Sequence, residues 1–309
     1  GRYRPSTPES IETIINSLAD YQNLKVFLDK FKKNYKKSEV FSLGRSVLGR
    51  DIFAIKIGRG KKLVLYAAAF HALEDLTANL LLKFSRDVAS AYENSKTAAG
   101  LNIYSALEDR SIVIVPLVNP DGLEIRRKGF SAASEFEEML TKNSAVPSYL
   151  WNSNARGVDL NHNYDANFEG LTSLLKEKGF CYPREKWFAG PYPESEPETK
   201  ALCSFCRNND VLSVYAFHSQ GEEIYYTYGE NLPHKSAIMA RMLSCLSGYS
   251  LSLPTGTAAS GGFKDWFITE FERPAFTIEA GLGTNPLPPE ALPDIYKRLR
   301  ELLVLGIVM

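Results

Sequence analysis

The chain has 309 residues, 44% of them apolar, and its 36 Lys and Arg side chains balance its 36 Asp and Glu side chains. A chain of this size can bury a large core, and no linker divides it, so we expect one domain over residues 1–309. The balanced charge argues against binding nucleic acid or an anionic membrane surface. The longest apolar runs span about eight residues, far below the roughly 20 that cross a bilayer, so we expect no membrane insertion.

The N-terminal part of the chain predicts a helical lead-in, a hairpin and a strand. The lead-in covers about residues 1–37 and contains two helices, of which the first is expected to run to about Asp20. Alternating segments around glycine-containing turns predict a hairpin over 38–57. The apolar run 62–70 predicts a strand that ends just before His71.

The middle of the chain predicts a strand, a helix and a second strand that pair in parallel. Residues 75–92 carry apolar side chains at helical spacing, and the apolar run 111–118 predicts a buried strand. A strand, helix, strand order favours parallel pairing. Residues 129–210 are irregular and aromatic, with helical patches, and long connections of this kind usually form the rim of a site.

The last third of the chain continues the alternation of strands and helices. Strands are predicted over 211–217 and 222–227, and a helix over about 235–248. A further apolar strand ends at Glu279, and an amphipathic helix over about 289–308 closes the chain. The pattern predicts an α/β fold.

Four polar residues, His71, Glu74, His218 and Glu279, stand at or just after the ends of apolar runs. In an open α/β sheet, residues just past the carboxyl ends of strands converge even when they are far apart in sequence. Imidazole and carboxylate ligands suit zinc, and three protein ligands leave a position open for water. We expect His218 to be the third ligand because it follows a strand, whereas His234 lies in a polar turn and is expected to be solvated.

Glu279 is predicted to face a polar cleft. An unpaired carboxylate buried at a strand end is costly, so it needs a cavity or a partner. Beside a metal ion it becomes the natural general base, and the alternative is a salt bridge at the strand end.

The order of these and other motifs resembles the zinc metallocarboxypeptidases, the carboxypeptidase A-like family. The resemblance extends from about Gly44 to the C-terminus, and six motifs in one order make chance implausible. They are His71-x-x-Glu74, Asn119-Pro-Asp-Gly122, Gly157-Val-Asp-Leu-Asn161, His218, Ser260-Gly-Gly-x-x-Asp-Trp266 and Phe276-Thr-Ile-Glu279.

The resemblance implies a single α/β domain with a mixed eight-stranded sheet flanked by helices. It also implies one zinc ion (Zn2+) held by the two histidines and by Glu74, with Glu279 as the base and later the proton donor. In the family an arginine polarises the scissile carbonyl. The nearest candidate here is Arg156, and Arg126 and Arg127 are alternatives.

Three departures from the family pattern bear on the substrate. Typical members have Asn-Arg where this chain has Asn161-His162, and that arginine clamps the C-terminal carboxylate of the substrate; a histidine cannot make the same two-pronged contact. The family's mobile tyrosine falls on Thr257. At the position that sets side-chain preference stands Lys264, which would select a carboxylate on the incoming residue, unless it is a solvated surface lysine.

One branch of the family shares more of the chain's local sequence. The stretches 151–161, 217–221, 264–267 and 285–288 look most like the bacterial γ-D-glutamyl-meso-diaminopimelate peptidases, which cut a bond in peptidoglycan stem peptides. Diaminopimelate carries a second amino acid head with its own carboxylate. That head would explain both the missing C-terminal clamp and the lysine at position 264.

The sequence therefore predicts a zinc peptidase that cleaves the γ-D-glutamyl-diaminopimelate bond, with a peptidoglycan-derived peptide as its partner. Asn161, His162, Lys264 and Thr257 are the candidate substrate-binding residues. Two alternatives remain open. One is a conventional carboxypeptidase for acidic or small C-terminal residues, and the other is a metal-free module that binds cell-wall peptides. A bacterial source is expected, with either a cytoplasmic or a secreted location.

Overall fold

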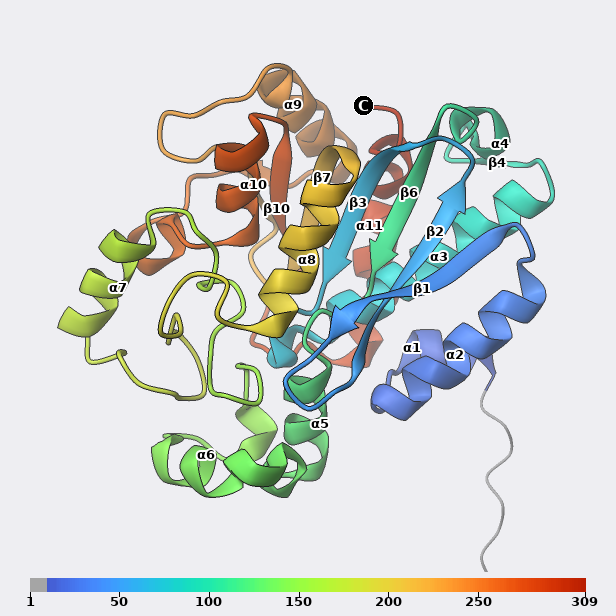
Figure 1. Ribbon diagram of the computed structural model, residues 1–309. Helices are drawn as coiled ribbons and strands as arrows, with labels where there is room; N and C mark the ends of the chain where they lie inside the picture. Colours follow the sequence, from blue (N-terminus) through green and yellow to red (C-terminus); the bar gives the residue numbers. More distant parts are fainter. Residues whose placement is uncertain (1–9) are drawn as a thin grey trace, which may run out of the picture.

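The computed structural model describes residues 10–309 and contains the predicted mixed sheet of eight strands (Figure 1). The strand order is β1-β2-β6-β3-β7-β10-β8-β9, and β4 and β5 form a separate small hairpin. The strands are β1 (Ser38–Arg45), β2 (Asp51–Gly58), β3 (Lys62–Ala68), β4 (Thr97–Ala98), β5 (Leu101–Asn102), β6 (Arg110–Val115), β7 (Asp210–His218), β8 (Glu223–Tyr225), β9 (Ser250–Leu251) and β10 (Ala275–Glu279).

The four central strands, β6, β3, β7 and β10, all run parallel to one another. On one side the predicted hairpin of β1 and β2 is confirmed, and β2 pairs with β6 in the antiparallel sense. On the other side β8 is antiparallel to β10. The carboxyl ends of the central strands therefore meet at one edge, where ligands bind in open α/β sheets.

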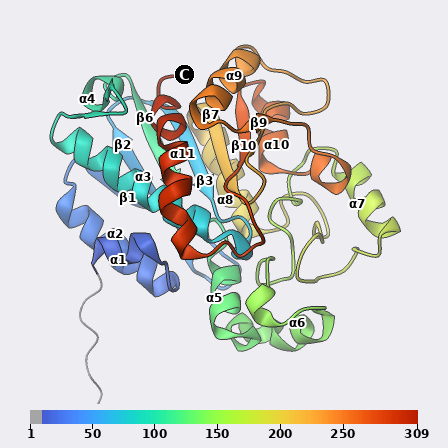
Figure 2. The same cartoon turned by 180° about the vertical axis from the view of Figure 1, so that it is seen from behind.

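Helices cover both faces of the sheet. Figure 1 shows α8 in front of the strands, and Figure 2, from behind, shows α3 and α11 across the opposite face. No helix within residues 10–309 is both long and apolar enough to cross a membrane. The helices are α1 (Ile11–Asn16), α2 (Tyr21–Asn34), α3 (Leu76–Glu93), α4 (Ile103–Ala106), α5 (Pro120–Lys128), α6 (Glu137–Asn143), α7 (Phe168–Glu177), α8 (Pro197–Asn208), α9 (Ser236–Ser247), α10 (Phe263–Phe271) and α11 (Leu292–Leu305), with short 3-10 turns that include η1 (Ala72–Glu74) and η4 (Gly256–Ala259).

The two faces of the sheet bury separate apolar cores, as β3 illustrates. Val64 and Tyr66 point into the core under α1, α2, α3, α9 and α11. Leu63 and Leu65 point into the core under α8 and α10. Because successive side chains of a strand alternate between faces, a strand covered on both sides reads as an uninterrupted apolar run.

Several predicted boundaries differ from the structure by a few residues, and the contacts account for two of them. The first helix ends at Asn16, not near Asp20, because the Asp20 side chain accepts from the backbone N–H of Asn23 and caps α2. The predicted strand 111–118 ends at Val115; beyond it the backbone N–H of Val118 donates to the carbonyl of Ala68, the last residue of β3, and that of Asn119 to the carbonyl of Ala69. The part of the lead-in before residue 10 lies outside the described residues.

A buried carboxyl cluster ties α8 to the loops beside the sheet. Asp121 pairs with Arg50 at 2.7 Å, and Glu196 accepts from the Asn154 amide at 2.8 Å. Glu198 is fully buried with only long hydrogen bonds of 3.4 Å. Burial, reinforced by the charge of Asp121, raises the pKa of Glu198 to about 8.

This raised pKa predicts a pH-dependent stability. Folded Glu198 holds its proton more tightly than the unfolded chain does, so the free energy of unfolding falls as pH rises from 4.5 to about 8. Between pH 5 and pH 8 the expected loss from this group is about 3 kcal/mol. Glu198→Gln should remove that slope, as measured by urea unfolding of both proteins at the two pH values. Parallel slopes in the two proteins would contradict the assignment.

Candidate metal centre and active site

His71 and Glu74 are carried by one tight turn just after β3. His71 precedes η1, and the backbone N–H of Glu74 donates to the carbonyl of His71 at 3.1 Å. Residues three apart in a 3-10 turn lie above one another, so both side chains face the same side. The backbone N–H of Ala72 donates to the carbonyl of Asn152 at 3.1 Å, which anchors the turn to the long connection between α6 and α7.

His218 and Glu279 are neighbours across two parallel strands. His218 is the last residue of β7 and Glu279 the last of β10, and the two are paired in register. Neighbouring strands lie about 4.8 Å apart, so this register brings both residues to the same edge. The ring of Phe70 stacks on the imidazole of His218 at 5.0 Å between ring centres, which restrains the imidazole.

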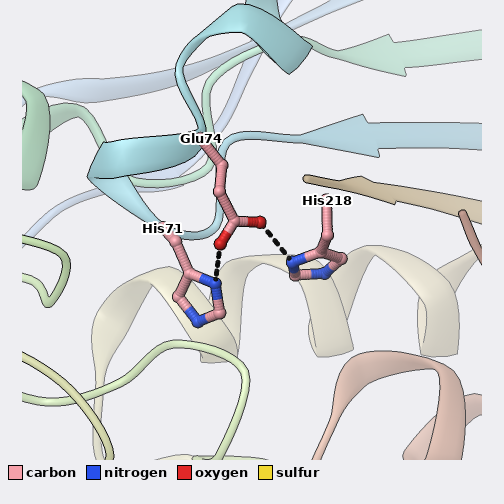
Figure 3. Close-up of side chains that lie close together, drawn as sticks. All are labelled: His71, Glu74 and His218. Atoms are coloured by element: carbon pink, nitrogen blue, oxygen red, sulfur yellow. Dashed lines mark hydrogen bonds and ion pairs between the residues drawn. The ribbon is translucent and has the colours of Figure 1, made fainter. Parts of the chain in front are cut away.

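His71, Glu74 and His218 form a group that could hold a metal ion, with one ligand atom from each lying within 4.8 Å of the others. Figure 3 shows the carboxylate of Glu74 between the two imidazole rings. Nδ1 of His71 is 2.7 Å from one carboxylate oxygen, and Nδ1 of His218 is 3.1 Å from the other. Two imidazoles and one carboxylate are a donor set of catalytic zinc sites.

Asp159 orients the first of these imidazoles. Its Oδ1 lies 2.7 Å from Nε2 of His71. An ionised carboxylate can only accept, so Nε2 donates to Asp159, and Nδ1, which faces Glu74, is the nitrogen that would give up its proton and bind a metal. Asp159 is itself held by the backbone N–H groups of Asn161 and Trp187. The sequence analysis quoted this aspartate within a motif but assigned it no role.

The charges of the group fit a cation. Burial alone would raise the pKa of Glu74, but the positive charge of His71 and hydrogen bonds from both histidines hold it at about 2. Burial alone would lower the pKa of His71, yet Asp159 and Glu74 outweigh burial and raise it well above the usual value. The two carboxylates therefore favour positive charge at this point of the structure.

Replacing Asp159 tests its orienting role. We expect Asp159→Asn to weaken zinc binding about 10–100-fold, as is typical when a histidine ligand loses its hydrogen-bonded carboxylate. Competition with a chromophoric chelator measures the affinity. Asp165→Asn is a matched control, because Asp165 is exposed in the same segment. Equal zinc affinities for the two variants would contradict the role of Asp159.

Glu279 lies next to the metal-binding group, and the pKa of its carboxyl is shifted from the usual value. Burial raises its pKa well above the usual value, and the negative charge of Glu74 adds to the effect. A cation held by the neighbouring ligands acts in the opposite direction and favours the carboxylate. A carboxyl whose proton affinity is raised by burial is suited to accept and release a proton near neutral pH.

A cavity of about 140 Å³ joins the metal-binding group to the predicted substrate residues. Seven of the nine predicted site residues line it, and Arg156 and Thr257 do not. The seven are His71, Glu74, Asn161, His162, His218, Lys264 and Glu279.

The family model for zinc carboxypeptidases matches residues 24–301, which is most of the chain. The chain belongs to the zinc carboxypeptidase family. It is therefore a zinc metallopeptidase, and zinc is the metal that the donor set of His71, Glu74 and His218 suits. The predicted family is confirmed.

Individual relatives agree with this membership. The chain is 32% identical to gamma-D-glutamyl-L-diamino acid endopeptidase 1 of Lysinibacillus sphaericus over 94% of its own length and 72% of the relative. It is 26% identical to carboxypeptidase B of Rattus norvegicus over 77% of its length and 56% of that protein. Thrombin activatable fibrinolysis inhibitor has a similar fold, with a TM-score of 0.73 and 19% identity over 98% of this chain and 76% of that one.

The three arginines considered for the scissile carbonyl lie outside the cavity lining. Arg126 donates to the carbonyl of Ala72 and pairs with Asp75 at 2.8 Å, and Arg127 pairs with the same aspartate. Arg156 is 43% exposed, and its guanidinium lies 3.7 Å from Glu196. Of the three, Arg156 has the loosest ion pair, and its role stays a prediction.

His162, predicted from the sequence to replace the clamping arginine, lines the cavity. Its Nδ1 lies 3.2 Å from the carbonyl oxygen of Asn161, so Nδ1 carries the ring proton. Its Nε2 is buried without a hydrogen-bond partner, and burial lowers the pKa of the ring. The neutral imidazole therefore offers an acceptor, whereas a guanidinium offers only donors. Asn161 also lines the cavity, with its amide oxygen held by the backbone N–H of Phe263 at 3.0 Å.

Lys264 is buried, so the alternative of a solvated surface lysine is wrong. Its ammonium donates to the carbonyl of Thr227 at 2.5 Å and to Oδ1 of Asp265 at 2.6 Å. Thr257 lies in η4, and its neighbour Ala258 lines the cavity instead. Lys264 therefore lines the cavity, whereas Thr257 does not.

Tyr225 and Asp265 are cavity residues that the sequence analysis did not single out. The phenol of Tyr225 donates to Glu223 at 2.8 Å, and burial raises its pKa. Tyr225 lies in β8, and the alternation of side chains along a strand is the sequence feature that could have placed it on the same face as the cavity. Asp265 follows Lys264 at the start of α10, where its Oδ2 accepts from the backbone N–H of Gly262 at 3.2 Å. Burial raises the pKa of Asp265 against the pull of the neighbouring ammonium.

Proposed function

We propose that this zinc peptidase cleaves the bond between γ-linked D-glutamate and a diamino acid, diaminopimelate, in peptidoglycan stem peptides. The observation that carries the proposal is the neutral, buried His162 where an arginine clamp would stand. The similarity to gamma-D-glutamyl-L-diamino acid endopeptidase 1 over 94% of the chain supports the same substrate class.

The lining of the cavity argues against recognition of an ordinary C-terminal carboxylate. No arginine among residues 10–309 lines it, and the one lysine among the described lining residues, Lys264, is paired with Asp265. A bidentate clamp on a carboxylate needs the planar fork of a guanidinium. Without it, a free C-terminus gains little affinity over a blocked one.

The roles of the residues follow from their positions. His71, Glu74 and His218 would hold zinc, which when bound supplies a Lewis acid and lowers the pKa of a water molecule. Glu279 accepts the proton of the attacking water and passes it to the leaving amine. Arg156 is proposed to turn from Glu196 toward the developing oxyanion, which is feasible because its present ion pair is long and its own side chain is partly exposed.

Asn161 is proposed to position the substrate. Its amide oxygen is already occupied by the N–H of Phe263, which directs the NH2 group toward other acceptors. A substrate carbonyl or carboxylate in the cavity is such an acceptor. Asn161 and His162 therefore present one donor and one acceptor side by side.

A blocked C-terminus tests the missing clamp. We expect amidation of the main-chain carboxyl of diaminopimelate in L-Ala-γ-D-Glu-meso-diaminopimelate to change kcat/KM less than about tenfold, because no charged hydrogen bond worth more than about 1.4 kcal/mol is lost. Chromatography of the released amino acid and its amide gives both rates. An enzyme that leaves the amidated peptide intact recognises the C-terminus, and the proposal then fails.

A further inference from the structure

The part of the cavity lined by Lys264, Asp265 and His162, here called its inner end, carries charges of both signs at close range. Lys264 and Asp265 line it, are buried to 4% and 2% exposure, and form an ion pair of 2.6 Å. The pair is neutral as a whole. A side chain with a single charge that enters this space approaches one favourable and one unfavourable partner, and it has to be desolvated to do so.

Each member of the pair has hydrogen-bonding capacity left. An ammonium has three donors, and Lys264 uses one on the carbonyl of Thr227 and one on Asp265. A carboxylate has about four acceptor positions, and Asp265 uses one on Lys264 and one on the backbone N–H of Gly262. One donor and further acceptor positions therefore remain beside the cavity.

His162 adds a second acceptor to the same cavity. Its Nε2 is buried with no hydrogen-bond partner, and its tautomer makes that nitrogen an acceptor. Its ring is close enough to Asp265 for the carboxylate to raise the pKa of the imidazole, although burial lowers it more. A buried acceptor without a partner has lost its hydrogen bonds to water, which a ligand N–H group restores.

We infer that the inner end of the cavity binds a side chain that ends in an α-amino acid head, with Lys264 donating to the carboxylate of that head and Asp265 and His162 accepting from its ammonium group. The carboxylate of such a head faces the ammonium of Lys264, and its ammonium faces the carboxylate of Asp265, so each charge meets one of opposite sign. A side chain with only a carboxylate or only an ammonium satisfies half of this arrangement. The inference rests on the proposed function only in taking the γ-D-glutamyl bond as the bond that is cut. Recognition of the amino acid head is a separate event, because the head lies at the far end of the side chain from that bond.

The test separates the head from the linkage. Two peptide series, L-Ala-γ-D-Glu-X and L-Ala-α-L-Glu-X, differ in the linkage, and X is varied within each. At the sixth carbon of X, meso-diaminopimelate carries an ammonium and a carboxylate, lysine only the ammonium, 2-aminopimelate only the carboxylate, and norleucine neither. Binding to the zinc-loaded Glu279→Gln chain is measured by calorimetry, so that no peptide is consumed. We expect diaminopimelate to bind at least about tenfold more tightly than lysine or 2-aminopimelate, since hydrogen bonds to charged groups contribute about 1.5–3 kcal/mol.

Two variants, each combined with Glu279→Gln, assign the charges. Asp265→Asn should abolish the preference for diaminopimelate over 2-aminopimelate and keep the preference over lysine. Lys264→Gln should abolish the preference for diaminopimelate over lysine and keep the preference over 2-aminopimelate. A uniform loss of affinity for all four head groups in both variants marks a structural role for the pair and overturns the inference.

The ligand series alone decides the matter if a variant does not fold. Equal affinities for diaminopimelate and 2-aminopimelate, or no measurable binding of any peptide, overturn the inference without any substitution at 264 or 265. Failure of the proposed function has a different signature. In that case α-linked peptides bind as well as γ-linked ones and the unsubstituted enzyme leaves the γ bond intact, while the preference for the amino acid head persists.

Discussion

The Glu279→Gln protein is expected to bind zinc like the unsubstituted chain and to hydrolyse its substrate at least about 100-fold more slowly. The amide has the shape of the carboxyl group but cannot accept the proton of the attacking water. Glu279 is paired in register with His218 and lines the cavity, which places it beside the metal ligands without making it one of them.

Two measurements on the same preparation check this expectation. Zinc per chain is determined by elemental analysis, and kcat with the γ-linked tripeptide by chromatography. Glu222→Gln is a matched control, because Glu222 immediately precedes β8, the strand that pairs with β10, forms an ion pair with Arg298 and lies outside the cavity. Near-normal turnover by the Glu279→Gln protein with its zinc in place would refute the assignment of the base.

The second large effect is expected from Glu74→Ala, which should abolish stoichiometric zinc binding. Both carboxylate oxygens of Glu74 face ligand atoms of the histidines. The substitution removes one of three ligands and the negative charge that balances the cation. The loss of zinc affinity should exceed the loss of about 10–100-fold expected for Asp159→Asn, which disturbs only the orientation of a ligand.

Zinc content after dialysis against a weak chelator measures this effect. The Glu279→Gln protein serves as the matched comparison, since it also lacks a carboxylate at the same edge of the sheet but should keep its metal. The backbone N–H of Ser219, which donates to Glu74 at 3.0 Å, loses its partner, so circular dichroism should accompany the metal assay. A folded Glu74→Ala protein with one zinc per chain would contradict the ligand assignment.

The residues that sequence reasoning located best are those at the ends of buried parallel strands. His218 and Glu279 end apolar runs, and the change from apolar to polar residues marks the end of such a strand in the sequence. His71-x-x-Glu74 was equally accessible, because a turn of three residues is local. The family resemblance then supplied the mixed sheet of eight strands, which the structure confirms.

Contacts between distant segments could not be predicted in the same way. Asp159 and His71 are 88 residues apart, and only the folded chain shows that they meet. The partner of Lys264 is its neighbour Asp265, but helical periodicity does not reveal that the Lys264 ammonium donates both to Asp265 and to the distant carbonyl of Thr227. Arg156 was chosen for its place in a motif, and the structure pairs it with Glu196 instead of placing it on the cavity.

The most direct test of the proposed function is a comparison of two peptides. The zinc-loaded protein is incubated with L-Ala-γ-D-Glu-meso-diaminopimelate and with an ordinary α-linked peptide that ends in a free acidic residue, and both are followed by mass spectrometry. Release of diaminopimelate with the ordinary peptide untouched is the result predicted here. Trimming of the ordinary peptide alone would contradict the proposal and identify a conventional carboxypeptidase.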